Sequence, residues 1–179
     1  MITFVEGSLF SASPLFSLAQ CISGDVACGM FRGISVQFLK FFPELEQIRL
    51  YEMLQLGEVL PWETGGKFIY NLVTKSNYWC KPVPYNLFMT LQTMRAHASE
   101  HFVSDIAMPF LGAGRDKLDF YNVVFPMIKT VFEDSPINIH VYYPKSQVIH
   151  MKRLVYACSH AQYYSYDIYI CFAPISFQV

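Results

Sequence analysis

Charged residues are scarce in this sequence, and the two signs nearly cancel. Asp, Glu, Lys and Arg make up 15% of the 179 residues, and the formal net charge is −1. An average soluble protein is about 25% charged. Together with 53% hydrophobic residues, this low charge excludes a disordered chain and a coiled coil. Because no basic field gathers phosphates, tight sequence-independent binding of nucleic acid is not expected either.

Long apolar runs are also missing. The uncharged apolar stretches near the C-terminus, 154–166 and 168–179, are shorter than the roughly 20 residues of a membrane-spanning helix, so no membrane partner is expected. The N-terminus lacks the basic segment and apolar core of a secretion signal. Five cysteines without close pairing indicate free thiols in a reducing compartment and favour no metal site. We therefore expect an intracellular protein, of the cytoplasm or nucleus.

What the sequence does have is an alternation of short apolar runs with amphipathic ones. Strands are predicted at 2–5, 17–22, 57–60, 68–73, 103–108 and 137–143. Helices are predicted from Gly33 to about Phe41, over 84–97, and over 119–132 despite Pro126. The paired glycines Gly65 and Gly66 predict a hairpin between the third and fourth strands. The alternation predicts an α/β fold, with a mixed central sheet covered by helices on both faces.

The last 35 residues, 145–179, differ in composition from the rest. They hold five of the twelve tyrosines and only four charged residues. We expect one domain at 1–144 and a tyrosine-rich C-terminal extension packed on that domain, with a helix near 148–160 and a strand near 167–172. The functional alternative is a surface for a partner or a second copy, because a large exposed apolar patch normally marks an interface.

Three segments are expected at the carboxyl ends of the strands, where open α/β sheets bind ligands. They are 23–33, 74–76 and 109–116. Glycines in the first and third let backbone N–H groups approach a diphosphate at the start of a helix. Neither a Walker loop nor the dinucleotide fingerprint in its usual place is present, and turn geometry alone would also account for the glycines.

Lys75 and Asp116 are the titratable residues of interest in these segments. Lys75 leaves an apolar strand, and a lysine withdrawn from water can serve as a nucleophile. The structural alternative is a solvated loop lysine. Asp116 has three interpretations: it pairs with Lys75, acts as a base on a hydroxyl, or caps a helix that begins near Leu118.

Taken together, several segments in order resemble a macro domain, the ADP-ribose-binding α/β module. Within that superfamily they are most similar to the terminal ADP-ribose glycohydrolase branch and to the related antitoxin macro domains. The similar segments span residues 1–143 and are 4–7, 18–23, 33–38, 42–44, 70–75 and 107–118. The resemblance thus covers the domain and omits the extension.

The resemblance implies a reaction, which is the hydrolytic removal of mono-ADP-ribose or terminal ADP-ribose from acidic side chains of proteins. Lys75 would attack the anomeric carbon of the distal ribose, and Asp116 would help to resolve the lysyl–sugar intermediate, with neither a cofactor nor a metal. The implied partners are ADP-ribose and ADP-ribosylated protein, and nucleic-acid-linked ADP-ribose stays open. The implied ligand-binding residues are Ser8, Leu9, Cys21, Ser23, Gly29, Met30, Phe31, Arg32, Gly33, Ile34, Thr74, Pro109, Leu111, Gly112, Ala113, Gly114 and Arg115.

Two positions depart from the family pattern. Ser8 stands where the family usually has an aspartate that accepts a hydrogen bond from the adenine amino group. Phe31 stands where the first glycine of a Gly-x-Gly turn is expected, and a side chain there restricts positive φ. Phe31 could stack on the ribose, turn outward or fill the pocket. These departures support an alternative function, that of a non-catalytic ADP-ribose reader with altered binding loops.

Overall fold

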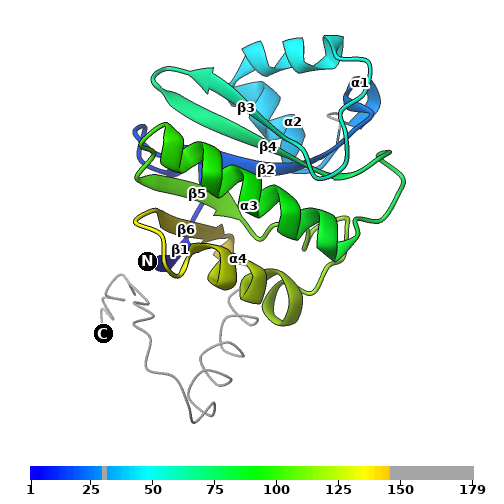
Figure 1. Ribbon diagram of the computed structural model, residues 1–179. Helices are drawn as coiled ribbons and strands as arrows, with labels where there is room; N and C mark the ends of the chain where they lie inside the picture. Colours follow the sequence, from blue (N-terminus) through cyan, green and yellow to red (C-terminus); the bar gives the residue numbers. More distant parts are fainter. Residues whose placement is uncertain (30–31, 146–179) are drawn as a thin grey trace, which may run out of the picture.

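The computed structural model describes residues 1–29 and 32–145 (Figure 1). Met30 and Phe31 lie outside the described residues, and so do the helix and the strand expected in the extension. Strands and helices alternate along the described chain as the sequence predicts. No helix in these two ranges is long and apolar enough to cross a membrane.

Within the described residues, six strands form one sheet. In chain order they are β1 (Ile2–Glu6), β2 (Ser17–Ser23), β3 (Val59–Thr64), β4 (Lys67–Lys75), β5 (Asp105–Pro109) and β6 (Asn138–Tyr143). Across the sheet the order is β1-β6-β5-β2-β4-β3, and all neighbours are parallel except β3 and β4. The antiparallel β3–β4 hairpin turns at Gly65 and Gly66, which both have positive φ, as the paired glycines predict.

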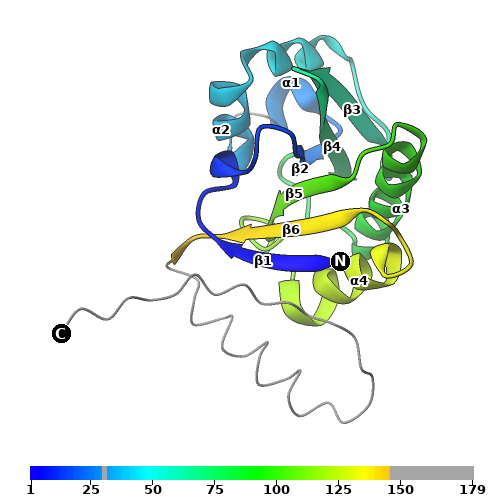
Figure 2. The ribbon, with the colours of Figure 1, turned by 90° about the vertical axis from the view of Figure 1, so that its left-hand side faces the viewer.

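Helices cover both faces of this sheet, as Figures 1 and 2 show. One face carries α1 (Val26–Gly29), α2 (Ile34–Phe41) and the 3₁₀ helix η2 (Pro43–Leu50), and the other carries α3 (Pro84–Glu100) and α4 (Phe125–Phe132). α3 begins at a proline, which suits the first turn of a helix, and it buries Leu87, Leu91 and Met94 at helical spacing. The predicted α/β fold is confirmed.

The predicted helix over 119–132 is wrong in one respect, because two helical segments stand there. A π-helical turn, η3 (Phe120–Val124), precedes α4. The N–H of Val124 donates to the carbonyl of Asp119, 3.2 Å away, which is the wide spacing of a π turn. Pro126 follows at the start of α4 and has no N–H to continue an α-helical ladder. The spacing of apolar residues along the sequence did not reveal this change of helical pitch.

A polar side-chain bridge joins the three strands at one side of the sheet. His140 on β6 lies between Asp105 on β5 and Thr3 on β1. Its Nε2 is 2.8 Å from Asp105 Oδ1, its Nδ1 is 2.8 Å from the Thr3 hydroxyl, and Phe16 stacks on its ring at 4.4 Å. Burial by itself raises the pKa of Asp105, but hydrogen bonds from His140, Ser104 and Asn138 outweigh it and hold that pKa below its ordinary value.

The sheet opens between β2 and β5. Within the described strands, β2 pairs with β5 only through Ser17 and Leu18, at the beginning of β2. The chain after β2 crosses one face of the sheet, and the chain after β5 crosses the other. Neighbouring strands whose connections leave in opposite directions create a crevice at their carboxyl ends, where α/β proteins bind ligands.

Candidate active site

A cavity of about 700 Å³ lies at the carboxyl ends of β2, β4, β5 and β6. Each strand contributes its last residues or the loop that follows, so the parallel sheet brings distant segments to one place. The residues that line the cavity are Cys21, Ile22, Ser23, Arg32, Gly33, Ile34, Ser35, Lys75, Tyr78, Trp79, Cys80, Lys81, Pro109, Phe110, Leu111, Gly112, Ala113, Gly114, Arg115, Asp116, Lys117, Tyr142 and Pro144. Its size suits a ligand larger than a single sugar or nucleobase.

An ion pair between Lys75 and Asp116 lies in the wall of this cavity. Lys75 Nζ is 2.6 Å from Asp116 Oδ1 and 3.3 Å from the carbonyl oxygen of Tyr78. Both charged side chains are only 14% exposed. Lys75 is therefore not a solvated loop lysine, and of the three interpretations of Asp116 the structure shows the pairing with Lys75. The helix-capping role belongs instead to Asp119, which accepts hydrogen bonds from the N–H groups of Tyr121 and Asn122.

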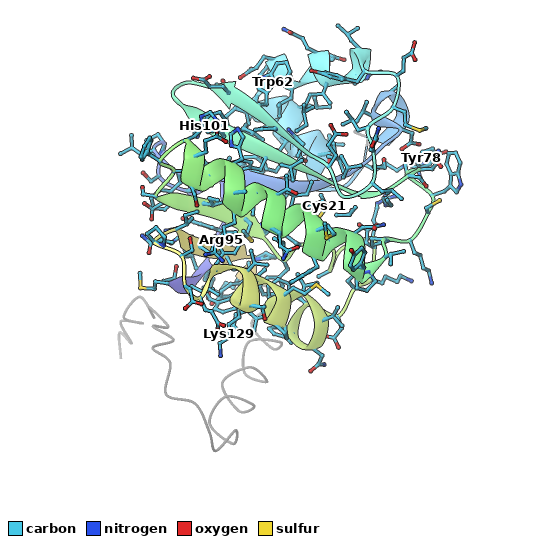
Figure 3. All side chains as sticks on the ribbon, in the orientation of Figure 1. Cys21, Trp62, Tyr78, Arg95, His101 and Lys129 are labelled. Atoms are coloured by element: carbon cyan, nitrogen blue, oxygen red, sulfur yellow. The ribbon has the colours of Figure 1, made fainter. Side chains whose placement is uncertain are left out.

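Cys21, on β2, lies beside this pair in the central part of the sheet, where Figure 3 labels it. Burial raises the pKa of its thiol to about 12, and the nearby Asp116 carboxylate contributes in the same direction. At neutral pH the thiol stays protonated and is a poor nucleophile. Cys21 is consequently no competitor of Lys75 for a nucleophilic role.

The segment after Lys75 is fixed by the loop that follows β2. Gly24 donates to the carbonyl of Lys75 at 2.8 Å, and Asp25 donates to the carbonyl of Ser76 at 2.9 Å. The Asp25 carboxylate then accepts from the N–H of Tyr78 at 3.1 Å. A Cβ at position 24 would lie 2.4 Å from the carbonyl oxygen of Leu54, so only glycine allows these two loops to approach so closely.

Two glycines of the cavity lining have positive φ. Gly33 has a φ of +64° and precedes α2, whose first turn has no side-chain cap. No atom would meet a Cβ at this position within 4 Å, so the start of α2 faces open space. Gly112 has a φ of +68°, and a Cβ there would lie 2.7 Å from Leu118 Cδ1. Free N–H groups at a helix start attract anions.

The cavity is basic although the whole chain is nearly neutral. Its only lining carboxylate among the described residues is Asp116, which already pairs with Lys75. The other charged lining residues are Arg32, Lys81, Arg115 and Lys117. Within the described ranges no carboxylate forms an ion pair with any of these four. The cavity therefore favours an anionic ligand.

Most of the positions implied by the resemblance meet at the cavity. They are Cys21, Ser23, Arg32, Gly33, Ile34, Lys75, Pro109, Leu111, Gly112, Ala113, Gly114, Arg115 and Asp116. Others do not line it: Ser8 caps the 3₁₀ turn η1 (Leu9–Ser11), Leu9 is buried, Thr74 is buried, and Gly29 ends α1. Their roles stay predictions, as do those of Met30 and Phe31.

Sequence reasoning missed several lining residues, above all Tyr78, Trp79 and Lys81. They lie in the loop between β4 and α3, which has no hydrophobic period to interpret. Two adjacent aromatic residues three positions after Lys75 were a usable signal, because loop aromatics beside a reactive residue often contact a ligand.

Two curated relatives decide the family. ADP-ribose glycohydrolase OARD1 of Homo sapiens is 40% identical over 141 residues, which cover 79% of this chain and 90% of the relative. OARD1 of Bos taurus is 39% identical over the same length and coverage. The chain belongs to the ADP-ribose glycohydrolase family of macrodomains. The predicted resemblance to the glycohydrolase branch is confirmed.

Solved macrodomains agree with this assignment. The macrodomain of Thermus aquaticus DarG matches with a TM-score of 0.70 and 25% identity, over 80% of this chain and 99% of that one. The macrodomain of Mycobacterium tuberculosis DarG matches with a TM-score of 0.71 and 25% identity, over 81% and 99%. No protein-family model matches the chain.

Proposed function

We propose that this macrodomain glycohydrolase removes ADP-ribose from acidic side chains of proteins, with Lys75 as nucleophile and Asp116 as general acid–base. The observation that supports this most is the Lys75–Asp116 contact of 2.6 Å, with both side chains mostly buried and facing a cavity. A nucleophile within hydrogen-bond distance of a base is the arrangement that covalent catalysis requires. The name of the OARD1 relatives supports the same reaction.

The cavity offers what ADP-ribose needs. Its volume of about 700 Å³ lies within the usual range for cofactor-sized ligands. The diphosphate would bind at the start of α2, which has no side-chain cap, and to the cations Arg32, Lys81, Arg115 and Lys117, which have no acidic partner among the described residues. The distal ribose would then lie over the Lys75–Asp116 pair.

The proposed chemistry proceeds in two balanced steps. Asp116 takes a proton from Lys75, and the amine attacks C1″ of the distal ribose. The C1″–O bond to the acceptor breaks, and its electron pair leaves with the carboxylate of the modified side chain. In the second step water attacks C1″ and the C1″–N bond breaks with its electron pair on the amine. The water loses one proton to solvent and becomes the new hydroxyl of ADP-ribose, and Asp116 returns its proton to the amine, which restores the Lys75 ammonium. Splitting one displacement into two lowers the barrier of each.

The test measures ADP-ribose release from a protein mono-ADP-ribosylated on glutamate. We expect Lys75→Ala to lower the rate by at least about a thousandfold, as losses of a catalytic nucleophile do. Lys75→Arg keeps the positive charge beside Asp116 but not the nucleophile, and should be equally inactive. Phe102→Ala changes a highly exposed side chain in the turn after α3 and should retain full activity. Equal release by wild type and Lys75→Ala would refute the proposal.

One observation favours the alternative of a non-catalytic reader. The Ser8 hydroxyl accepts a hydrogen bond from the N–H of Phe10 at 3.3 Å, so this side chain serves a local cap and does not extend toward the cavity wall. A reader would bind ADP-ribose, in a calorimetric titration, with the same affinity in wild type and Lys75→Arg and would release nothing from the modified protein.

A further inference from the structure

The loop that follows Lys75 has a rigid centre. Tyr78 is held at three points: its carbonyl accepts from Lys75, its N–H donates to Asp25, and the Arg32 guanidinium lies 4.8 Å from its ring centre. Inside the loop, Cys80 donates to the carbonyl of Asn77 at 3.0 Å. A segment with this many contacts keeps its next residue in a defined place beside the nucleophile.

That next residue is Trp79, whose large side chain contributes little to the packing of the interior. Trp79 is 67% exposed, while its ring meets Tyr78 edge to face at 4.8 Å and lines the cavity. Tyr78 lies at the end of the molecule opposite His101 (Figure 3). Leaving most of an indole in water forfeits a large apolar contact. An exposed tryptophan on an anchored loop is a typical binding anchor.

The cavity can hold ADP-ribose but not the macromolecule to which it is attached. At about 700 Å³ it matches one cofactor-sized ligand, so an acceptor chain must stay outside and touch the rim. Among the described lining residues, the exposed side chains at that rim are Trp79, Pro144 and the cations Arg32, Lys81, Arg115 and Lys117. Since the diphosphate engages cations inside the site, Trp79 is the large apolar group left for the acceptor.

The surface beyond Trp79 favours a peptide as that acceptor. Past Lys81, the large exposed side chains at the beginning of α3 are apolar: Val83 is 54% exposed, Tyr85 66% and Met89 37%. A nucleic-acid backbone would require cations along this path. An extended peptide, with apolar and polar side chains in alternation, can use both Trp79 and the apolar residues that follow.

We propose that Trp79 is a specificity-determining residue that binds the peptide flanking the modified side chain, outside the ADP-ribose cavity. This inference rests on the proposed function for the choice of ligand, but it concerns recognition of the acceptor and not the chemical step. Trp79 supplies affinity that free ADP-ribose cannot use.

The test compares two ligands in the Lys75→Ala background, where nothing is turned over. Calorimetry measures the affinity for free ADP-ribose and for a short peptide ADP-ribosylated on glutamate. We expect the modified peptide to bind about tenfold more tightly than free ADP-ribose, which is typical of one tryptophan anchor. Adding Trp79→Ala should abolish this advantage, so that the modified peptide and free ADP-ribose bind the variant with the same affinity. Trp79→Phe should restore most of it, and Phe102→Ala, at the other end of α3, should change neither.

Three outcomes overturn the inference. The first is that the modified peptide gains no affinity over free ADP-ribose, and the second is that the gain persists in Trp79→Ala. The third is that a gain that depends on Trp79 occurs only with an ADP-ribosylated oligonucleotide. Kinetics separates this from the proposed function. If wild type releases ADP-ribose from the peptide and Trp79→Ala does so with an unchanged KM, the inference fails alone; if wild type binds the modified peptide through Trp79 but releases nothing, only the catalytic proposal fails.

Discussion

Two ion pairs in this molecule have nearly the same geometry and different surroundings. Lys75–Asp116 spans 2.6 Å with both side chains 14% exposed, and His140–Asp105 spans 2.8 Å with side chains 15% and 23% exposed. The first pair faces a cavity. The second is enclosed by the Thr3 hydroxyl and the stacked ring of Phe16. By distance and burial alone the proposed catalytic pair resembles a structural one, and what differs is the free space beside it.

Removing the carboxylate of the reactive pair should have the largest effect. We expect Asp116→Asn to lower the rate of ADP-ribose release by about a hundredfold or more, because a general acid–base contributes that much. The amide can still accept a hydrogen bond from Lys75, but the mostly buried Lys75 charge loses its partner, so the free energy of unfolding should fall by about 1–3 kcal/mol. Release assays and urea unfolding check both values. A variant that is inactive because it no longer folds would contradict the comparison.

Breaking the enclosed pair, His140–Asp105, should lower stability and leave activity nearly unchanged. His140→Ala removes two hydrogen bonds and the stack on Phe16, and leaves the Asp105 carboxylate without its histidine. We expect it to lower the free energy of unfolding by about 2–3 kcal/mol and to leave kcat/KM at 25 °C within twofold. His140→Gln keeps one donor and should lose less. A large loss of kcat/KM in a folded variant would show that this pair also reaches the active site.

Acid should weaken the enclosed pair in a defined range. Because hydrogen bonds hold the pKa of folded Asp105 below its ordinary value, the stability it contributes is present above its unfolded pKa, near pH 4. That stability is lost as the pH falls through the folded pKa. The free energy of unfolding should therefore fall less steeply in Asp105→Asn than in wild type as the pH drops below 4, as denaturation at each pH would show. The exposed carboxylate Asp134 offers the control, since Asp134→Asn should leave the slope unchanged.

The smallest expected effect concerns the thiol beside the reactive pair. With the pKa of Cys21 raised to about 12, only about one molecule in ten thousand carries the thiolate at pH 8. Iodoacetamide should therefore label Cys21 far more slowly than a model thiol, as peptide mass spectrometry would show. Labelling should accelerate in Asp116→Asn, because the neighbouring negative charge is then gone. Rapid labelling in wild type would contradict the burial of this site.

The sequence allowed the order of elements and the reactive pair to be predicted for one reason. Apolar periodicity marks strands and helices, and parallel strands bring their carboxyl ends together, so Lys75 and Asp116 had to lie at the same edge. The π turn at 120–124 was missed because Pro126 changes the pitch without changing the apolar spacing. Tyr78 and Trp79 were missed because their positions depend on a contact with Asp25, which lies 53 residues earlier, and no local pattern encodes such a contact.

Gly24 makes this chain sensitive to substitution at a position that does not line the cavity. It touches no ligand and carries no reactive atom, yet it holds the exit of β4 through its bond to the carbonyl of Lys75. An alanine there would collide with the carbonyl of Leu54 and displace Lys75 together with the loop that carries Trp79. We therefore expect Gly24→Ala, which adds a single methyl group outside the cavity lining, to abolish ADP-ribose release.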